Sequence, residues 1–325
     1  MQGPSQKLRI VVLGYIVRGP VGGMAWHHLQ YVLGLAALGH EVHFLEDSDD
    51  YPSCYDPSKH VVDVDPTYGL AFARQAFDRL GLGDHWTYYD AHGQKWYGPG
   101  AEKAQRFCDD ADMVINVSGV NPLRRWTMAI ERRLFIDTDP VFTQVKHLTD
   151  RAKRDRAAAH NRFFSFGEAL STAAWSGPRD EFDWQPTRQP VVRSLWSNSK
   201  PQPRGRFTTV MQWDSYPAVE YSGASYGMKS ESFQAYLGLP GRVDEQFELA
   251  LGSVTAPRER LRDHGWHLVD PLAVTRDPWT YQSYIENSKA EFSVAKQGYV
   301  ASRCGWFSER SACYMAAGKP VVVQD

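Results

Sequence analysis

The feature that most constrains the fold is a strand–turn–helix–strand pattern near the start of the chain. Residues 8–17, LRIVVLGYIV, are almost all apolar and mostly branched, which is typical of a parallel strand buried on both faces. After a glycine-rich turn, apolar residues recur at helical spacing, as at Leu29, Val32 and Leu33. Gly39 stands where helices commonly end, and EVHFLED supplies the next strand. This order of elements predicts a doubly wound α/β domain.

The same alternation continues to about residue 170 and starts again near residue 207. Residues 171–206 between them are rich in proline, serine and arginine, a composition typical of a connection between domains. A chain of 325 residues allows about two domains. We therefore predict two doubly wound, Rossmann-like domains facing a cleft, formed by residues 1–170 and 207–325.

The composition excludes several classes of protein. Lysine plus arginine (36) against aspartate plus glutamate (38) gives a net charge of −2, which argues against a nucleic-acid coat or a membrane-surface anchor. No apolar run reaches the roughly 18 residues that a membrane span needs. The four cysteines lack C-x-x-C spacing, as expected of free thiols in a reducing compartment, so we predict a cytoplasmic protein without a zinc site.

Aromatic residues make up 13% of the chain, and many lie in segments that look irregular, such as HWTYYDAHGQKWYGPG. Rings in loops either anchor packing or stack on the C–H face of a sugar.

The first glycine-rich turn matches neither G-x-G-x-x-G nor the P-loop, which also requires a lysine and a hydroxyl residue. Gly22 and Gly23 remain as a pair at a helix N-terminus that can approach a ligand closely, and a tight structural turn explains them equally well. His27 and His28 follow on the first turns of the helix. A histidine there is a candidate base or donor to a sugar hydroxyl, the alternative being a surface or core histidine.

The segment FIDTDP places Asp137 and Asp139 at the end of a predicted buried strand, on one face. They are candidates for a metal pair, a general base, or two anchors for sugar hydroxyls. Asp139 before Pro140 also suits a turn cap.

The last predicted helix opens with Ser308 as its N-cap and ends before Gly318. Its N-terminus offers free N–H groups and a partial positive charge. Arg310 and the hydroxyls of Ser308 and Ser311 add donors, which suits a diphosphate, and Glu309 is a candidate acceptor for a sugar or ribose hydroxyl. A helix that is only well capped is the alternative.

Two lysines extend this picture. Lys229 comes immediately before another predicted helix, and Lys296 lies close in sequence to the last one. A cation at one side and a helix terminus at the other can bracket a diphosphate without a metal, whereas a solvated lysine is the simpler explanation.

These motifs resemble those of GT-B-fold glycosyltransferases. GWFSERSAC with YMAAGKPVVVQD is similar to the donor-site helix of the group 1-like members, E-A-M-A-x-G-x-P-V-V, and VGGMAWHHLQYVLGLAALGHEVHFL looks like their N-terminal G-G-x-x-x-H pattern. Lys229 is similar to the lysine that the family places against the donor diphosphate. The two glutamates of the retaining branch fall on Gly305 and Cys313, so their contacts do not carry over, and Glu309 is the candidate replacement.

The resemblance implies a metal-independent, hexosyltransferase-type enzyme without a cofactor, which moves a sugar from a nucleotide-diphosphate sugar, UDP-sugar first, to an acceptor hydroxyl. The second domain would hold the donor and the first the acceptor; the acceptor is open, and nothing in the sequence indicates nucleic acid. A nucleotide-sugar epimerase of the same architecture and a non-catalytic nucleotide- or sugar-binding protein are the alternatives. Because more chain normally follows the last strand in this fold, we expect the second domain to be incomplete at Asp325.

Overall fold

The computed structural model describes residues 7–196 and 200–324. They form two compact units, and each unit is assembled from several stretches of chain. The first comprises Met1–Thr138, Asp150–Ser165 and Phe182–Gln185, and the second comprises Asp139–Thr149, Phe166–Glu181 and Pro186–Asp325. The sequence-based division at residues 170 and 206 instead treats each domain as one continuous stretch.

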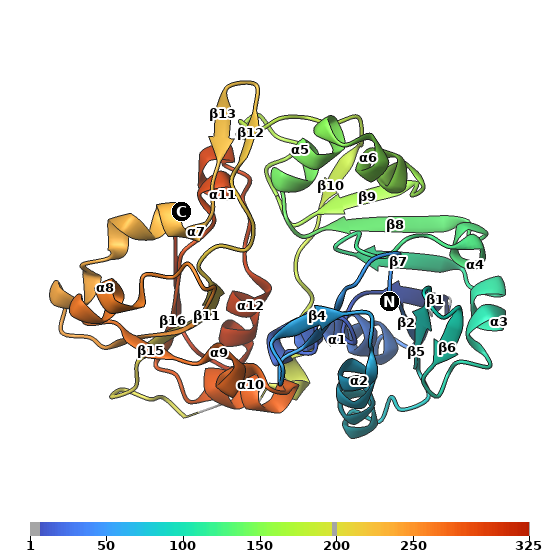
Figure 1. The fold of residues 1–325 in the computed structure, drawn as a ribbon, viewed down its shortest axis with the longest axis horizontal. Coiled ribbons are helices and arrows are strands. Elements are labelled where there is room, and N and C mark those ends of the chain that lie inside the picture. Colours follow the sequence, from blue (N-terminus) through green and yellow to red (C-terminus); the bar gives the residue numbers. More distant parts are fainter. Residues whose placement is uncertain (1–6, 197–199, 325) are drawn as a thin grey trace, which may run out of the picture. The chain divides into compact units, whose positions relative to one another are not determined.

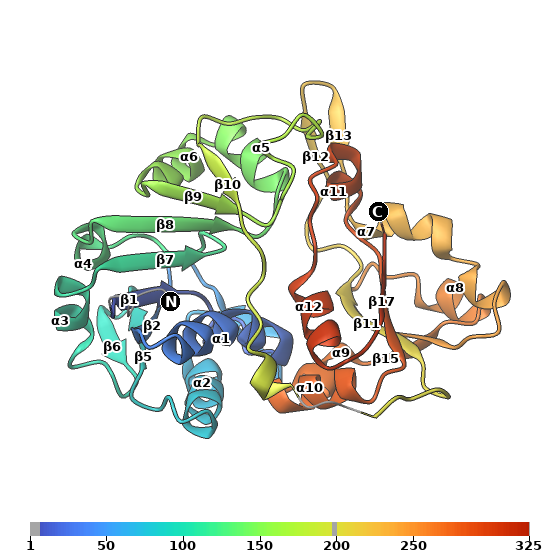
Figure 2. The ribbon, with the colours of Figure 1, turned by 180° about the vertical axis from the view of Figure 1, so that it is seen from behind.

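The first unit contains an eight-stranded sheet that can be followed in Figure 1 and, from behind, in Figure 2. Its strands are, in spatial order, β10 (Trp184–Pro186), β9 (Arg162–Ser165), β8 (Arg132–Asp137), β7 (Met113–Val117), β1 (Arg9–Leu13), β2 (Glu41–Asp47), β5 (Trp86–Asp90) and β6 (Lys95–Tyr97). β1 pairs in parallel with β2 on one side and β7 on the other, so the chain reverses its direction of progress at β1. The predicted α/β class is confirmed.

Burial explains why this sheet forms from these residues. Val11, Leu13, Leu45 and Val114, from β1, β2 and β7, are almost wholly buried and share one apolar cluster with Phe107. Burying such side chains on folding contributes roughly 1.5–3 kcal/mol each. The two strands of the predicted strand–turn–helix–strand segment therefore lie at the centre of the sheet.

The aromatic segment that the sequence analysis treated as irregular is a β-hairpin. β5 pairs in parallel with β2 and antiparallel with β6, which closes the sheet edge. Trp86 and Tyr88 are fully buried, while Tyr89 packs on Trp96 with ring centroids 4.8 Å apart. These rings build the core and the sheet edge of the first unit, so the suggestion that this segment lines a sugar site is replaced by a packing role.

The remaining elements of the first unit flank the sheet. They are α1 (Gly22–Ala37), the hairpin β3 (Cys54–Asp56) and β4 (Val61–Asp63), α2 (Thr67–Arg79), α3 (Ala104–Asp109), α4 (Arg125–Met128) and α6 (Arg151–Ala158). Residues 141–165 contain two helices and the strand β9. Asp150 caps α6 by accepting from the amides of its first turn, which separates it from the preceding helix.

The second unit is built on a five-stranded, fully parallel sheet. Its spatial order is β15 (His267–Val269), β14 (Phe247–Gly252), β11 (Phe207–Gln212), β16 (Ala290–Ser293) and β17 (Val321–Val323). The helices are α5 (Phe142–Thr149), α7 (Lys229–Phe233), α8 (Arg258–Asp263), α9 (Pro271–Thr275), α10 (Pro278–Glu286), α11 (Gln297–Ser302) and α12 (Glu309–Ala316). Three 3₁₀ turns lie at Arg193–Leu195, Gln234–Tyr236 and Leu239–Gly241.

Two features of the second half escaped the sequence analysis. The hairpin β12 (Val219–Tyr221) and β13 (Ala224–Tyr226) interrupts the connection from β11 to α7 and extends away from the second sheet in both views. The proline-rich segment 171–206 is also more than a connection, because it contributes β10 to the first sheet.

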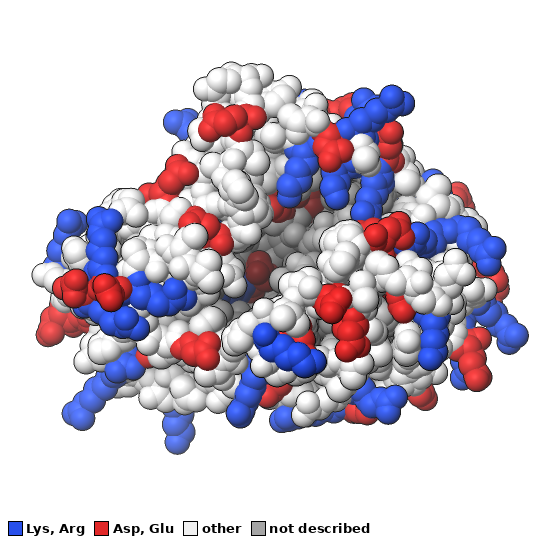
Figure 3. All heavy atoms as spheres, viewed as in Figure 1, with Lys and Arg blue, Asp and Glu red and all other residues white. Residues whose placement is uncertain are grey.

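Charged side chains of both signs are interspersed over the face shown in Figure 3, with lysines and arginines gathering over α6. In the part of the chain that the structure describes, no helix combines the length and apolar character needed to cross a membrane.

Candidate functional site

The second sheet has a topological switch point at the carboxyl ends of β11 and β16. The chain proceeds from β11 to β14 on one side and returns to β16 on the other, so the segments that follow these two strands diverge there. Ligands of doubly wound folds bind at such a switch point. Three of the predicted residues, Lys229, Lys296 and Arg310, act electrostatically on one another at this place.

Lys229 is the first residue of α7, and its side chain is half-buried. Burial, together with the positive charges of Arg310 and Lys296, lowers its pKa to about 7. Within residues 7–196 and 200–324, no hydrogen bond or ion pair engages its ammonium group. Such a half-buried cation without a partner is suited to an anionic ligand, which would repay the cost of burying the charge.

Arg310 differs from the prediction. Its side chain is 7% exposed and turns inward, with Nε 2.6 Å from Glu291 and Nη1 2.8 Å from the carbonyl of Val210. Nη2 donates to Ser293. Burial alone would lower the pKa of Arg310, but Glu291 outweighs it and keeps the guanidinium charged. Glu291 is fully buried in β16 and requires a cation. Arg310 therefore forms an internal ion pair with Glu291 and does not serve as a direct contact for the diphosphate.

Lys296 is also paired, with Asp139. Its ammonium lies 2.7 Å from the carboxylate of Asp139 and 2.7 Å from the hydroxyl of Tyr216, and Tyr299 donates to the same carboxylate. Burial would raise the pKa of Asp139, but the charges of Lys296 and Lys146 hold it below its usual value. Asp139 therefore stays ionised inside the second unit and anchors Lys296.

The N-terminus of α12 is formed as predicted. Ser308 is the N-cap and accepts from the amide of Arg310, and Gly318 follows the helix with φ 71°. Ser311 is fully buried, and its hydroxyl has no hydrogen-bond partner in the described part of the chain. Glu309 is partly exposed, and its charge raises the pKa of both Lys229 and Lys296, so it belongs to the same site.

In the first unit, the glycine-rich turn is held by an internal carboxylate. Glu46 is fully buried at the end of β2 and accepts from the amides of Ile16, Val17 and Arg18 at 2.6, 2.8 and 2.7 Å. Burial raises the pKa of Glu46, while Arg18 and these three amides act in the opposite direction. The place where a dinucleotide fold binds phosphate is thus occupied by the protein itself.

Gly22 and Gly23 begin α1, and the N-cap Val21 provides no side-chain cap. The N-cap side chain therefore leaves the first amides of the helix uncapped, which is compatible with the predicted ligand approach. The two histidines that follow differ in accessibility: His27 is 8% exposed, and His28 is fully buried.

His28 is enclosed by aromatic rings and by the backbone of Gly14, where a Cβ would lie 2.5 Å from its Nδ1. Neither ring nitrogen of His28 has a hydrogen-bond partner among the described residues. Burial, with the charges of His27 and Arg18, holds the pKa of His28 well below its usual value, so the ring is neutral. This enclosure disagrees with the prediction of His28 as a base for a substrate hydroxyl.

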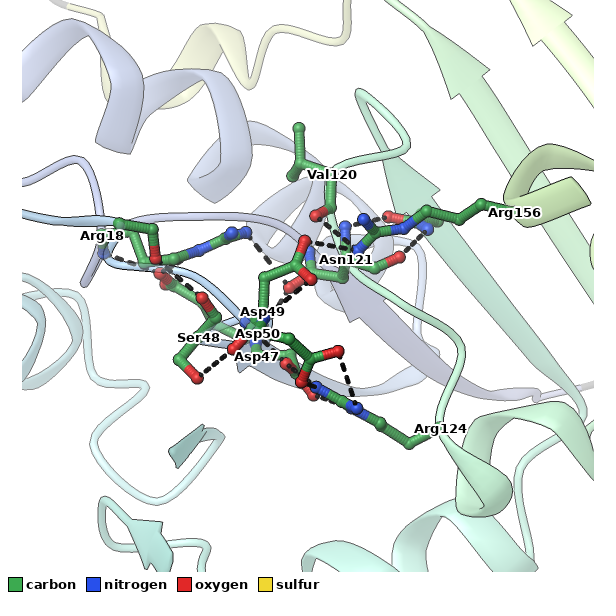
Figure 4. A network of polar contacts seen from close by, with 12 residues as sticks. Arg18, Asp47, Ser48, Asp49, Asp50, Val120, Asn121, Arg124 and Arg156 are labelled. Carbon is green, nitrogen blue, oxygen red and sulfur yellow. Dashed lines mark hydrogen bonds and ion pairs between the residues drawn. The ribbon is translucent and has the colours of Figure 1, made fainter. Parts of the chain in front are cut away.

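A polar network that the sequence analysis missed lies at the carboxyl ends of β1, β2 and β7 (Figure 4). Asp47 accepts from Arg124 at 2.9 Å, and Asp49 accepts from Arg156 of α6 at 2.6 Å. Asn121 joins the strands, since its side chain accepts from the amide of Asp47 and donates to the carbonyl of Gly14.

Asp49 has a left-handed backbone with φ 62°, which is uncommon for a residue other than glycine. The run of acidic residues in LEDSDD was the only available signal for this network, because the arginine partners are distant in sequence.

The two aspartates of FIDTDP do not act as a pair. Asp137 belongs to the first unit, is 1% exposed and accepts from Ser165 of β9 at 2.7 Å. Asp139 belongs to the second unit and binds Lys296 of the same unit. No cluster of three or more metal-ligating side chains occurs among residues 7–196 and 200–324.

The comparison with solved structures assigns the fold. An alpha-glucosyltransferase (AGT) in complex with UDP matches with a TM-score of 0.53 at 11% identity, over 98% of this chain and 80% of that chain. An alpha-glucosyltransferase in complex with UDP-glucose and DNA containing an abasic site matches with a TM-score of 0.54 at 10% identity and the same coverage. The chain has the fold of the GT-B glycosyltransferases.

At these identities the likeness to GT-B enzymes is one of fold. No protein-family model matches the sequence, and no curated protein matches it. A proposal for the function of this chain must therefore be argued from its own residues.

Proposed function

We propose that this chain transfers a sugar from a nucleoside-diphosphate sugar, UDP-sugar first, to an acceptor hydroxyl. The observation that carries the proposal is Lys229, a half-buried ammonium without a partner at the switch point of the second sheet. The structures with the same fold contain UDP or UDP-glucose, which supports a nucleotide diphosphate as the ligand.

In this reaction the bond between the anomeric carbon and the diphosphate oxygen breaks, and a bond from that carbon to the acceptor oxygen forms. The leaving diphosphate gains negative charge as the bond breaks, and an ammonium aimed at it stabilises that charge without a metal ion. Lys229 supplies this charge in the proposal. The partial positive charge at the start of α12 adds to it, and Lys296 contributes through its field.

The acceptor must lose its hydroxyl proton, and the first unit holds the candidate groups. Of the two predicted histidines, His27 is 8% exposed while His28 is fully buried, so we assign the hydroxyl-directed role to His27. Gly22 and Gly23, at the start of the same helix, remain candidates for close approach of the backbone to a ligand.

Donor binding and turnover test the proposal separately. UDP binding is measured by calorimetry in the wild type, in Lys229→Met, and in Lys153→Met, which removes an exposed lysine of α6 as a matched control. Loss of a charge-assisted contact should weaken UDP binding by about ten- to a hundredfold in Lys229→Met only. Equal UDP affinity in all three proteins would contradict the assignment of Lys229.

Turnover is followed as release of UDP from UDP-glucose with and without added acceptors, in chelator and in magnesium. Acceptor-dependent release that persists in chelator is the expected result. Restoration of turnover by magnesium would show that metal independence is wrong and that the diphosphate charge is balanced differently.

A further inference from the structure

A pocket of about 550 Å³ lies in the second unit beside Lys229. It is formed by the segments that follow the adjacent strands β11 and β14 and by the start of α7, and the residues on either side of Lys229, Met228 and Ser230, line it. Ligand pockets commonly measure roughly 300–1,000 Å³, so this volume accommodates a sugar ring or a nucleoside.

The lining determines what kind of group the pocket accepts. Two carboxylates, Asp214 and Glu231, line it, and no lysine or arginine is among its lining residues. An anionic group such as the diphosphate is therefore repelled, whereas hydroxyl groups are suitable donors to the carboxylates. Val254 and Met228 add apolar surface, which matches the C–H face of a sugar ring.

Two glycines create room for the polar side chains of the pocket. A Cβ on Gly227 would lie 1.8 Å from the carboxylate of Glu231, and a Cβ on Gly252 would lie 2.4 Å from the amide of Gln212. Neither glycine has a positive φ, so steric room alone distinguishes glycine from alanine at these positions. The Glu231 carboxylate and the Gln212 amide nitrogen make no hydrogen bond elsewhere in the described part of the chain.

The remaining wall is fixed by the ion pair described above. Tyr216 lines the pocket, and its hydroxyl is bound to both Asp139 and Lys296. Asp214 accepts from Thr255 at 3.1 Å and is also held through its backbone by Ser253. Asp214 is therefore positioned before a ligand arrives, which lowers the entropy cost of binding.

We propose that this pocket binds the vicinal hydroxyls of a neutral sugar ring, with Asp214 and Glu231 accepting from the hydroxyls and the amide of Gln212 donating to one. The inference rests on the proposed function in one respect: the ring belongs to the ligand whose diphosphate lies at Lys229. It also supplies acceptors besides Glu309 of α12.

The test compares Asp214→Asn and Glu231→Gln with Glu259→Gln. Glu259 is a matched control because, like Glu231, it is an exposed glutamate in the first turn of a short helix of the same unit, and it lies outside the pocket. We expect about a tenfold loss of UDP-glucose affinity in each pocket variant and none in the control. Removing a negative charge near a diphosphate strengthens its binding electrostatically, so a loss of affinity identifies a broken hydrogen bond.

Gly252→Ala provides a second variant that keeps every polar group. Its Cβ displaces the flexible end of Gln212, which costs the fold little, so the melting temperature should stay near that of the wild type while UDP-glucose affinity falls.

Two further nucleotides identify the ring. If the transferred sugar occupies the pocket, the variants lose affinity for UDP-glucose and keep their affinity for UDP. If the ribose occupies it, they lose affinity for both, and 2′,3′-dideoxy-UDP binds the variants and the wild type equally. Either pattern supports the proposal.

Unchanged affinity for all three nucleotides in Asp214→Asn and Glu231→Gln overturns the pocket assignment and leaves Lys229 untouched. Failure of the wild type to bind any of them overturns the proposed function, and the inference with it.

Discussion

The affinity for a donor should fall steeply with rising pH, because Lys229 must be protonated to bind a diphosphate. Its pKa in the free protein is about 7, so half of the molecules carry the charge at pH 7. A bound diphosphate places negative charge beside the ammonium and raises its pKa. Binding therefore favours the protonated form, and affinity is greatest below pH 7 and is lost as pH rises above it.

The size of this effect follows from the protonated fraction of Lys229. With a pKa of about 7 this fraction falls from about one half at pH 7 to about one hundredth at pH 9. If the pKa in the complex lies above 9, the dissociation constant rises about fiftyfold over this interval, with a limiting slope of one decade per pH unit.

UDP-glucose is the appropriate ligand for this measurement, because it lacks the terminal phosphate that titrates near pH 6. Calorimetric titrations between pH 6 and pH 9 at constant ionic strength give the dissociation constant directly. Lys229→Arg should bind with little dependence on pH, since a guanidinium stays charged throughout, and Lys229→Met should be weak and equally flat.

Two results would refute the reasoning. A wild-type affinity that is constant from pH 7 to pH 9 would mean that Lys229 has an ordinary pKa or does not meet the diphosphate. The same decline in Lys229→Met would assign the titration to another group.

Three changes should act mainly on stability. Asp139→Asn leaves the ammonium of Lys296 without its counter-ion and should lower the free energy of unfolding by about 2 kcal/mol in urea titrations, with a smaller deficit at pH 10 than at pH 7 because Lys296 can then lose its proton. Gly14→Ala inserts a methyl group 2.5 Å from the ring of His28 and should cost about 1–3 kcal/mol, measured in the same way; an unchanged midpoint would show that the ring can move. Arg310→Met removes the partner of a buried carboxylate and should cost about 3–5 kcal/mol, whereas a stable variant with weakened UDP binding would restore the direct ligand role.

The sequence predicted those parts of the molecule that depend on neighbouring residues. The order β1, α1, β2 follows from apolar spacing, and α12 begins at Ser308 because its hydroxyl accepts from an amide two residues away. The two separate sheets follow from the repeated alternation of strands and helices.

The parts that were missed depend on distant partners. Arg310 looked like a ligand contact because its partner Glu291 lies in another element, where its burial is not visible from the sequence. The pair of Asp47 and Arg124 joins residues 77 positions apart. The hairpin β5–β6 was taken for a loop because its pairing with β2 is not evident from its own residues.

The buried carboxylate of Glu46 has a consequence for selectivity. Its carboxylate already accepts from three amides of the turn. It therefore competes with any phosphate for these amides, and it is always close to them because it belongs to the same chain. A free dinucleotide cannot match the effective concentration of a covalently attached anion. The amides of Ile16, Val17 and Arg18 are thus closed to phosphate by the protein itself, and in the function that we propose the diphosphate is bound in the second unit, at Lys229.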